Sequence, residues 1–211
     1  MAGRSHHPRT AQDGIPARAI ASALAMSVTE VLRKITTALD QAGIAYMLSG
    51  SFASAYHGVP RATQDVDLVI EATAAQLEAF VRGLPRESYY ADLDAALDSH
   101  RGQSLFNVID LVTGWKIDFI ICKSRAFSRM EFGRRQRVDV QGLHIFVASA
   151  EDIVIAKLEW AKLGGSQRQI EDVIAILRLR RESLDRSYLE KWVRELGLAQ
   201  QWNAALRAAG K

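Results

Sequence analysis

Residues 50–67 constrain the fold of this chain more than any other stretch, because a glycine-serine turn is followed there by two aspartates one residue apart. A predicted strand ends just before Gly50 and Ser51, and a short helix starts at them. A second predicted strand then carries Asp65 and Asp67. Because side chains alternate between the two faces of a strand, both carboxylates point the same way. The run therefore predicts two adjacent strands that bring a helix start and an acidic pair together.

The charge of the acidic pair indicates its chemistry. Two carboxylates on one face repel each other unless a cation lies between them. Hard oxygen ligands of this kind suit Mg²⁺, which usually takes one or two protein carboxylates together with substrate phosphates. The turn at Gly50 and Ser51 offers free backbone N–H groups and the positive end of a helix dipole, where phosphates can bind. Together these features predict a site for a nucleoside triphosphate and Mg²⁺.

The ordered set resembles the signature of the nucleotidyltransferase superfamily typified by DNA polymerase beta, which is Gly-Ser, a short helix, then Asp-x-Asp and an apolar residue. In this chain the positions are Gly50, Ser51, Asp65, Asp67 and Leu68. The resemblance implies an α+β fold: a small mixed β-sheet nucleotidyltransferase core with flanking helices, followed by a C-terminal helical region. It also implies a Mg²⁺-dependent nucleotidyltransferase that moves a nucleoside monophosphate from a nucleoside triphosphate to an acceptor hydroxyl.

The superfamily uses a third carboxylate on a later strand, and the sequence offers two candidates. Asp118 lies in the run Lys-Ile-Asp-Phe-Ile, and Asp110 also lies in a strand-like run. Asp118 has the better apolar flanks and is preferred. By the resemblance, Asp65 and Asp67 would hold the metal on the triphosphate. Asp118 would help to bind a second metal and would draw in the acceptor hydroxyl.

Other residues near the acidic pair have both a site role and an ordinary role open to them. Arg61 and Thr63 come just before the pair and are predicted to contact the phosphates. A salt bridge from Arg61 to Asp65 explains the arginine equally well. His57 either lines the pocket or packs as an ordinary side chain. Lys116 shares a strand face with the third carboxylate, and its charge tempers that of the acid.

The pattern from Ser149 onward is all helical. Ser149 and Asp152 belong to a capping box that marks a helix start. Lys157 interrupts the apolar face of that helix, so it either extends to solvent or answers a buried anion. On the next helix Arg168 and Asp172 are four residues apart, and they can pair on its surface.

This helical half resembles the C-terminal part of stand-alone bacterial nucleotidyltransferases related to the toxins of type IV toxin–antitoxin and abortive-infection systems. The resemblance rests on residues 150–157 and 166–173. In those toxins a lysine and a downstream aspartate complete the site, which implies substrate-binding roles for Lys157 and Asp172. The resemblance also makes an antitoxin a candidate partner. The chain departs from the toxins at one position, because they usually have a basic residue directly before that aspartate, whereas this chain has Glu171.

The chain divides into three parts. Residues 1–26 lack hydrophobic periodicity and are predicted to be a disordered extension, residues 27–148 form the core, and residues 149–211 form the C-terminal helical region. A capping box at Ser27 predicts that the first helix begins there and ends near Gly43. The expected strands are 44–48, 65–71, 104–112, 115–122, 137–140 and 143–147, and the expected helices between them include 73–82 and 88–98.

Composition excludes several classes of protein. The net charge of the 211 residues is only +3, which indicates no general affinity for polyanions. The single cysteine, Cys122, cannot form an internal disulfide and is expected to be a buried thiol. No stretch approaches the about 18 to 20 apolar residues of a membrane span, and no good signal peptide is present. We therefore expect a cytoplasmic protein with no membrane partner.

A cluster of arginines after the Asp118 strand bears on the acceptor. Its members are Arg125, Arg129, Arg134, Arg135 and Arg137. Basic clusters beside an active site attract phosphates. RNA, including a transfer RNA end, is therefore the expected acceptor, ahead of a protein hydroxyl or a small-molecule hydroxyl such as an antibiotic's. The ordinary explanation is a solvated loop that balances acidic residues elsewhere.

Two other functions stay open at this point. One is a non-catalytic nucleotide-binding or antitoxin-like module on the same fold. The other is an unrelated α+β protein whose aspartates are surface residues.

Overall fold

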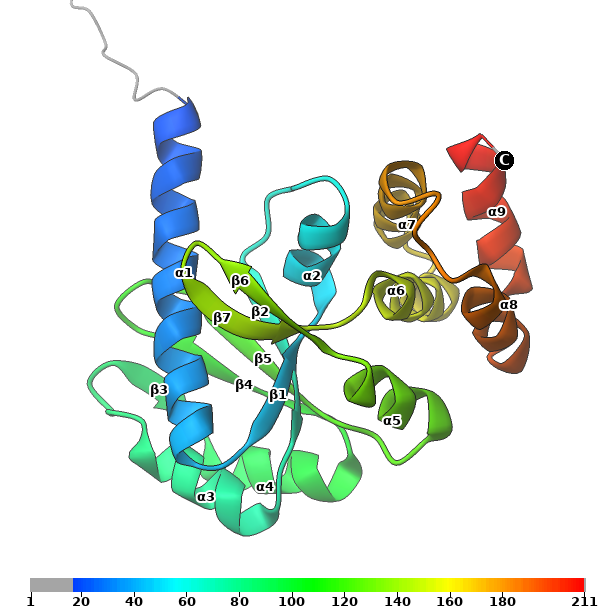
Figure 1. Cartoon of the computed structure of the whole chain (residues 1–211). Helices are drawn as coiled ribbons and strands as arrows, with labels where there is room; N and C mark the ends of the chain where they lie inside the picture. The colour runs from blue at the N-terminus through cyan, green and yellow to red at the C-terminus, as the bar shows by residue number, and fades with distance from the viewer. Residues whose placement is uncertain (1–16, 211) are drawn as a thin grey trace, which may run out of the picture.

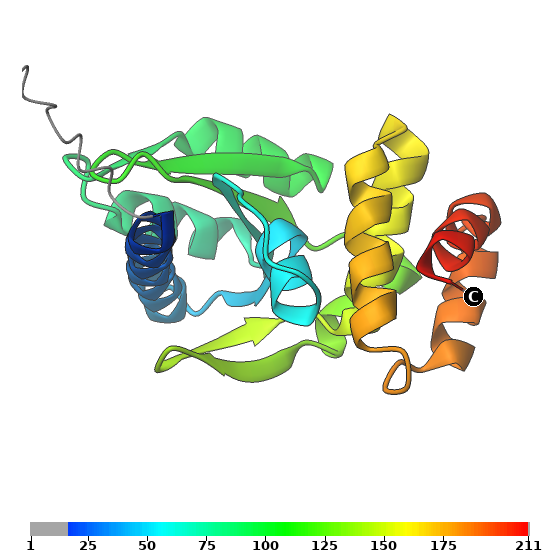
Figure 2. The same ribbon diagram turned by 90° about the horizontal axis from the view of Figure 1, so that it is seen from above.

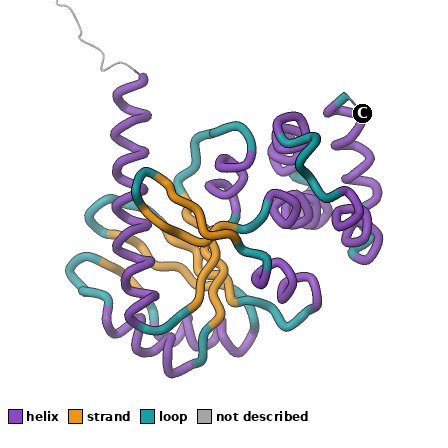
Figure 3. The backbone as a smooth tube through the Cα atoms, viewed as in Figure 1, coloured by secondary structure: helices purple, strands orange, loops and turns teal. Residues whose placement is uncertain are grey.

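The structure is a computed structural model that describes residues 17–210, so the predicted disorder of residues 1–16 lies outside the described part of the chain. A mixed seven-stranded sheet has the strand order β3-β4-β5-β2-β1-β7-β6. Figure 3 shows its strands in orange, with helices around them. The strands are β1 (Ala45–Leu48), β2 (Asp65–Glu71), β3 (Tyr89–Ala91), β4 (Leu105–Asp110), β5 (Lys116–Ile121), β6 (Gln136–Val140) and β7 (Leu143–Val147).

Strand β2 lies in the middle of the sheet and sets the position of the acidic pair. It runs antiparallel to β1 and parallel to β5. Val66, Leu68 and Ile70 alternate with the aspartates and are fully buried on one face of the sheet. On that face Phe119 of β5 packs against Phe80, with ring centroids 5.2 Å apart. The alternation therefore places the carboxylates on the opposite face.

The helices form two groups on either side of the sheet (Figures 1 and 2). They are α1 (Ala17–Gln41), α2 (Gly50–His57), α3 (Ala74–Gly83), α4 (Leu93–Gly102), α5 (Ala126–Gly133), α6 (Ala150–Gly164), α7 (Gln167–Leu179), α8 (Arg186–Glu195) and α9 (Ala199–Ala209). Helices α1, α3 and α4 cover the apolar face, while α6 to α9 pack together as a bundle beside the core. Helix α2 contacts both β2 and the bundle, through α6 and α7.

The first helix begins earlier than the sequence pattern predicted. Helix α1 starts at Ala17, so Ser27 lies inside the helix and is not its N-cap. The prediction of disorder is therefore wrong for residues 17–26. Five of the ten residues in that segment are alanine, which has the highest helix propensity, so the helix extends towards the N-terminus although no apolar face was recognised there.

The predicted helix over residues 88–98 is also wrong in its first part. Residues Tyr89–Ala91 form the edge strand β3, which pairs antiparallel with β4. Asp92 then caps the N-terminus of α4 by accepting a hydrogen bond from the backbone N–H of Ala95. Two adjacent tyrosines fit a pleated strand, and aspartate is a preferred N-cap residue. The pattern therefore holds two elements where one was expected.

No helix within residues 17–210 is both long and apolar enough to cross a membrane.

Candidate active site

Asp67 and Asp118 are neighbours across the sheet. They occupy the same register position on the parallel strands β2 and β5, so their side chains share one face. Asp65 lies two residues earlier on β2, opposite Lys116. The Lys116 ammonium lies between two of the acids, with Nζ 3.0 Å from Asp118 Oδ2 and 3.5 Å from Asp65 Oδ1. The structure thus brings the three predicted carboxylates together with one cation among them.

The electrostatics of this group favour an additional cation. Burial raises the pKa of Asp67, and the nearby charge of Asp118 raises it further, while a hydrogen bond from the Ser51 backbone N–H and the charge of Lys157 oppose the rise. Asp118 Oδ1 is buried and has no hydrogen-bond partner among the described residues. An unpaired carboxylate oxygen beside a second carboxylate is costly unless positive charge satisfies it.

These carboxylates fit a hard divalent cation that takes its other ligands from a substrate. Within residues 17–210 no three His, Cys, Asp or Glu side chains converge closely enough to hold a metal by themselves. Mg²⁺ usually needs only one or two protein carboxylates when phosphates supply the remaining oxygens. The arrangement of Asp67 and Asp118 meets that requirement, with Asp65 on the same face of β2.

The glycine-serine turn is built around Asp67. The Ser49 backbone N–H donates to the Asp67 carbonyl at 2.9 Å, and the Ser51 backbone N–H donates to the Asp67 carboxylate. Gly50 has a φ of +58°, and a Cβ at this position would lie 1.9 Å from Asp67 Oδ2. Only glycine therefore allows the helix start to approach the carboxylate this closely.

A second cluster of charges joins the core to the helical bundle. Arg61 donates from Nε to Asp172 Oδ1 at 2.9 Å and from Nη2 to Asp172 Oδ2 at 3.1 Å. It also reaches Ser51 Oγ at 2.7 Å. Lys157 Nζ lies 2.8 Å from Asp172 Oδ2, and both side chains are buried. Asp172 thus holds two cations beside the turn that packs on Asp67.

The partners of Asp172 favour its ionised form. Burial alone would raise the pKa of Asp172, but the hydrogen bonds and charges of Arg61 and Lys157 outweigh burial, so its pKa lies below the ordinary value. Two of the ordinary explanations are therefore wrong. Arg61 pairs with Asp172 and not with Asp65, and Asp172 does not pair with Arg168.

The remaining candidates separate into site and scaffold. Thr63 lines the cleft beside Asp65, whose backbone N–H approaches Thr63 Oγ1 at 3.5 Å. The Asp110 carboxylate accepts the backbone N–H groups of the turn between β4 and β5, so it holds that turn. His57 is buried, and its Nε2 lies 2.7 Å from the Ala148 carbonyl oxygen; burial lowers its pKa. His57 therefore packs the core and does not line the cleft.

A cleft of about 300 Å³ lies over the carboxylates, between the sheet and α6. Its lining includes the predicted Gly50, Ser51, Thr63, Asp65, Asp67, Asp118 and Lys157, together with Ser49, Leu105, Trp160 and Gln169. Sequence reasoning assigned no site role to these last four. Trp160 had one available signal, because it follows Lys157 by three residues and so shares its side of the helix.

The arginine cluster is largely used within the protein. Arg125 forms a two-pronged ion pair with Glu159, and Arg129 pairs with Glu71. Arg134 pairs with Asp152 and lies over the Tyr188 ring, and Arg135 lies over the Phe132 ring. Four of the five arginines therefore already have partners, which weakens the case for a phosphate-binding patch.

Comparisons with known proteins place the fold. No family model matches the chain, and no curated protein matches it significantly. The solution structure of the antibiotic-resistance factor ANT(2'')-Ia is similar, with a TM-score of 0.52 and 16% identity over 87% of this chain and 96% of that chain. A crystal structure of ANT(2")-Ia in complex with adenylyl-2"-tobramycin has a TM-score of 0.51 and 17% identity over 83% and 99% of the two chains.

A nucleotidyltransferase-like protein gives the same result. The crystal structure of an antigenic nucleotidyltransferase-like protein from Paracoccidioides brasiliensis has a TM-score of 0.50 and 19% identity, covering 88% of this chain and 92% of that chain. The chain therefore has the fold of the nucleotidyltransferases, as its sequence predicted: an α+β core with a C-terminal helical region.

Proposed function

We propose that the protein is a Mg²⁺-dependent nucleotidyltransferase that moves a nucleoside monophosphate from a nucleoside triphosphate to an acceptor hydroxyl. One observation carries the proposal: Asp67 and Asp118 share a register position on parallel strands, and the Gly50 turn closes onto Asp67. Two adjacent carboxylates next to a helix start are suited to a metal-bound triphosphate, because the carboxylates bind the metal ion and the helix start binds the negatively charged phosphates.

The transfer itself follows from the positions of the acids. Asp65 and Asp67 would hold Mg²⁺ on the triphosphate, and Asp118 would share the metal site and orient the acceptor hydroxyl through its free Oδ1. When bound, Mg²⁺ lowers the charge barrier to an in-line displacement. The hydroxyl oxygen forms a bond to the α-phosphorus, the bond to the bridging oxygen breaks, and pyrophosphate leaves with that electron pair. The hydroxyl proton passes to Asp118 Oδ1.

The phosphates would be held where the helix start meets the charged cluster. Ser51 offers its hydroxyl group, which lies beside Arg61, and Lys157 lines the same cleft. Both carboxylate oxygens of Asp172 are already engaged by these two cations. We therefore assign Asp172 a positioning role: it orients Arg61 and Lys157 and does not contact the substrate itself.

A small molecule is the favoured acceptor. The RNA expectation rested on the arginine cluster, and most of that cluster is paired within the protein. A neighbour of the same fold was crystallised with adenylyl-2"-tobramycin, a small molecule that carries a nucleotidyl group. A role in a toxin–antitoxin pair stays a prediction from the sequence resemblance.

One observation favours the alternative of a non-catalytic nucleotide-binding module. The Lys116 ammonium lies between Asp118 and Asp65, where it neutralises part of the charge that a metal would neutralise. Lys116 is partly exposed on a strand face, however, so its side chain can swing away when a stronger cation arrives.

A test of triphosphate binding distinguishes the enzyme and the nucleotide-binding module from a protein that binds no nucleotide. We expect at least one of the four nucleoside triphosphates to raise the melting temperature of the protein in Mg²⁺. Excess EDTA should abolish this increase. Ligand that binds only the folded state stabilises it by mass action. No shift with any triphosphate in Mg²⁺ would rule out both the enzyme and the binding module.

The acceptor is identified by where the label goes. We expect α-labelled nucleoside triphosphate and Mg²⁺ to label a small-molecule hydroxyl, with tobramycin as the first probe, in preference to total RNA or total protein in parallel tubes. Label in RNA alone would restore the original expectation. Metal-dependent binding without label in any tube, across a wide panel of hydroxyl compounds, would favour the non-catalytic module.

Gly50→Ala tests the close approach of the turn to Asp67. The new Cβ would overlap the Asp67 carboxylate, so either the turn or the acid must move. A displacement of about 1 Å in a catalytic group can lower the rate about 100-fold, and we expect a loss of that order. Gly83→Ala is the matched control, because nothing lies within 4 Å of a Cβ there. Equal transfer rates in the two variants would contradict the assignment of this turn.

A further inference from the structure

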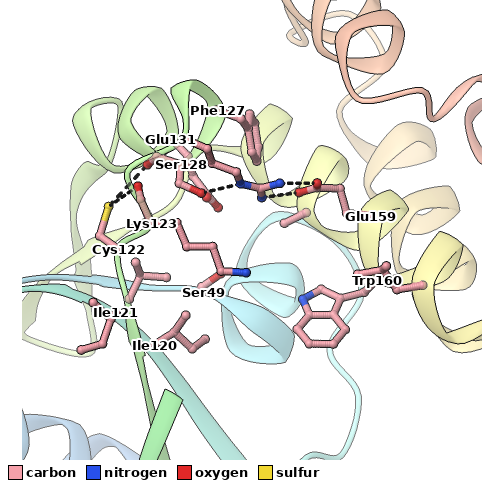
Figure 4. A pocket seen from close by; sticks show the side chains of 14 residues that line it. Ser49, Ile120, Ile121, Cys122, Lys123, Phe127, Ser128, Glu131, Glu159 and Trp160 are labelled. Carbon is pink, nitrogen blue, oxygen red and sulfur yellow. Dashed lines mark hydrogen bonds and ion pairs between the residues drawn. The ribbon is translucent and has the colours of Figure 1, made fainter. Parts of the chain in front are cut away.

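A second cavity of about 180 Å³ opens beside the active-site cleft (Figure 4). It shares Ser49, Ile120, Ala156 and Trp160 with the cleft, so the two spaces adjoin each other. Its far wall comes from the end of β5 and from helices α5 and α6. The proposed function gives this cavity no role.

The cavity contains a buried acid without a partner. Glu131 is only 7% exposed, and its carboxyl group is influenced by burial and by the charges of Asp152, Arg125 and Glu159, with no hydrogen bond from a described residue contributing. Burial raises the pKa of Glu131 to about 8, and the nearby Asp152 contributes to the rise. At neutral pH the group therefore keeps its proton and offers one O–H donor and one carbonyl acceptor. A buried polar group left unpaired in this way costs stability, which is a mark of a binding site.

An exposed aromatic ring stands at the junction of the cavity and the cleft. Trp160 is 58% exposed on α6, between the buried Lys157 and the exposed Leu163 on the same side of that helix. It follows Lys157 by three residues, so its Cα atom lies about 4.5 Å farther along the helix axis. A cation for phosphates and a flat ring for a base are thus placed one helical turn apart.

The order of groups along the cleft indicates the occupant. A hollow lined by Arg61 shares Ser51 and Thr63 with the cleft, whereas the cavity shares Ser49 with the cleft and no residue with that hollow, so the hollow and the cavity flank the cleft as its two ends. A triphosphate with its outer phosphates at the first end and its α-phosphate at the carboxylates would continue into the cavity as a nucleoside. The rim near Leu105, which is 47% exposed, leaves a separate approach for the acceptor.

We propose that this cavity is the nucleoside subsite, in which Trp160 stacks on the base and Glu131 hydrogen-bonds to the nucleoside. The proposal rests on the proposed function, because it assumes that the phosphates bind at the Gly50 turn. Arg125 and Glu159 neutralise each other in that wall, and Lys123 is its remaining charged side chain; Val69, Ile120, Ile121 and Phe127 make most of the rest of the lining apolar, which suits a ring system.

Inorganic tripolyphosphate isolates the contribution of the nucleoside. We expect the wild-type protein in Mg²⁺ to bind its preferred nucleoside triphosphate more tightly than tripolyphosphate. Trp160→Ala should weaken nucleotide binding about 5- to 100-fold, the range for loss of one base–aromatic stack, and leave tripolyphosphate binding unchanged. Tyr90 lies on β3 away from the cleft and has a similarly exposed ring. Tyr90→Ala should therefore change neither nucleotide binding nor tripolyphosphate binding.

Two variants of Glu131 test the hydrogen bond. Glu131→Gln keeps a neutral donor and acceptor of the same shape, so it should bind nucleotide within about threefold of wild type. Glu131→Leu keeps the bulk without polar atoms, and nucleotide binding should fall about tenfold or more while tripolyphosphate binding is retained. Melting temperatures confirm that each variant is folded.

Each other outcome overturns the subsite. If Trp160→Ala lowers transfer but leaves nucleotide binding unchanged, the cavity holds the acceptor. If nucleotide and tripolyphosphate bind equally to the wild-type protein, the nucleoside has no subsite here. Both of these results leave the proposed function standing. If neither nucleotide nor tripolyphosphate binds in Mg²⁺, the proposed function fails first and the subsite fails with it.

Discussion

Asp67→Asn and Asp118→Asn are each expected to lower nucleotidyl transfer by on the order of a thousandfold while leaving the fold intact. The two acids share one register position. In each variant an amide NH₂ group replaces one carboxylate oxygen, so the reacting centre loses a metal ligand or a proton acceptor. Stability should not fall, because the charge of Asp118 raises the pKa of Asp67 and the pair therefore repels. Removing one of two repelling charges relieves that repulsion.

The measurement pairs transfer of an α-labelled nucleotide with the melting temperature of the metal-free protein. Asp98→Asn is the matched control, because Asp98 is an exposed acid of α4 on the opposite side of the sheet. It should change neither quantity appreciably. If either cleft variant transferred nucleotide at the wild-type rate, the carboxylates would not be the reacting centre. A large loss of stability without substrate would show that these acids hold the fold.

The parts of the fold that were predictable are those with a strong local pattern. The bounds of β2 at Asp65–Glu71 match the prediction, because polar and apolar residues alternate from Asp65 to Leu68 and an apolar run then continues to Glu71. The start of α6 also matches, since the Ser149 hydroxyl accepts the backbone N–H of Asp152. In both places the few residues that determine the structure are adjacent in sequence, so no distant contact can override them.

The parts that were not predictable depend on distant partners. Arg61 and Asp172 are 111 residues apart, and nothing in the spacing of either indicates that they meet. The local alternative, a pair between Arg168 and Asp172 on one helix, has the right spacing but loses to a bidentate partner from the core. The short strand β3 failed for a related reason, because a three-residue edge strand owes its existence to its neighbour β4.

The aspartates of the candidate site could be predicted from the sequence, whereas the residues that line the cleft and the cavity could not. Asp65 and Asp67 were predicted from the alternation of one strand, and Asp118 from the resemblance to the superfamily and its apolar flanks; the register of β2 and β5 brings the three acids together. Trp160 and Glu131 belong to helices whose tilt against the sheet decides what they face. A tryptophan or a glutamate in a helical pattern has no sequence feature that distinguishes a surface position from a cavity wall.

Asp172→Ala is expected to destabilise the protein by about 3–5 kcal/mol, because it leaves two cations beside each other without their shared anion. Lys157 is buried, and Arg61 is mostly covered, so water cannot readily take the place of the carboxylate. The loss should be measured by urea unfolding at neutral pH. Asp98→Ala breaks an exposed pair with Arg101 and should cost less than about 1 kcal/mol.

A double variant separates the buried charge from the packing. Asp172→Leu alone should be strongly destabilising, whereas Asp172→Leu combined with Lys157→Met should regain much of the loss, since no buried ammonium then lacks a partner. Lys157→Met alone leaves Asp172 with Arg61, so it should cost less stability but weaken binding of tripolyphosphate in Mg²⁺. If Asp172→Ala were as stable as wild type, the cluster would not stabilise the junction between the bundle and the core. If Lys157→Met bound tripolyphosphate normally, the cluster would not hold phosphates. Because Asp172 links Arg61 of the core to Lys157 of the bundle, the same contact that stabilises the junction also keeps both cations in place for the substrate.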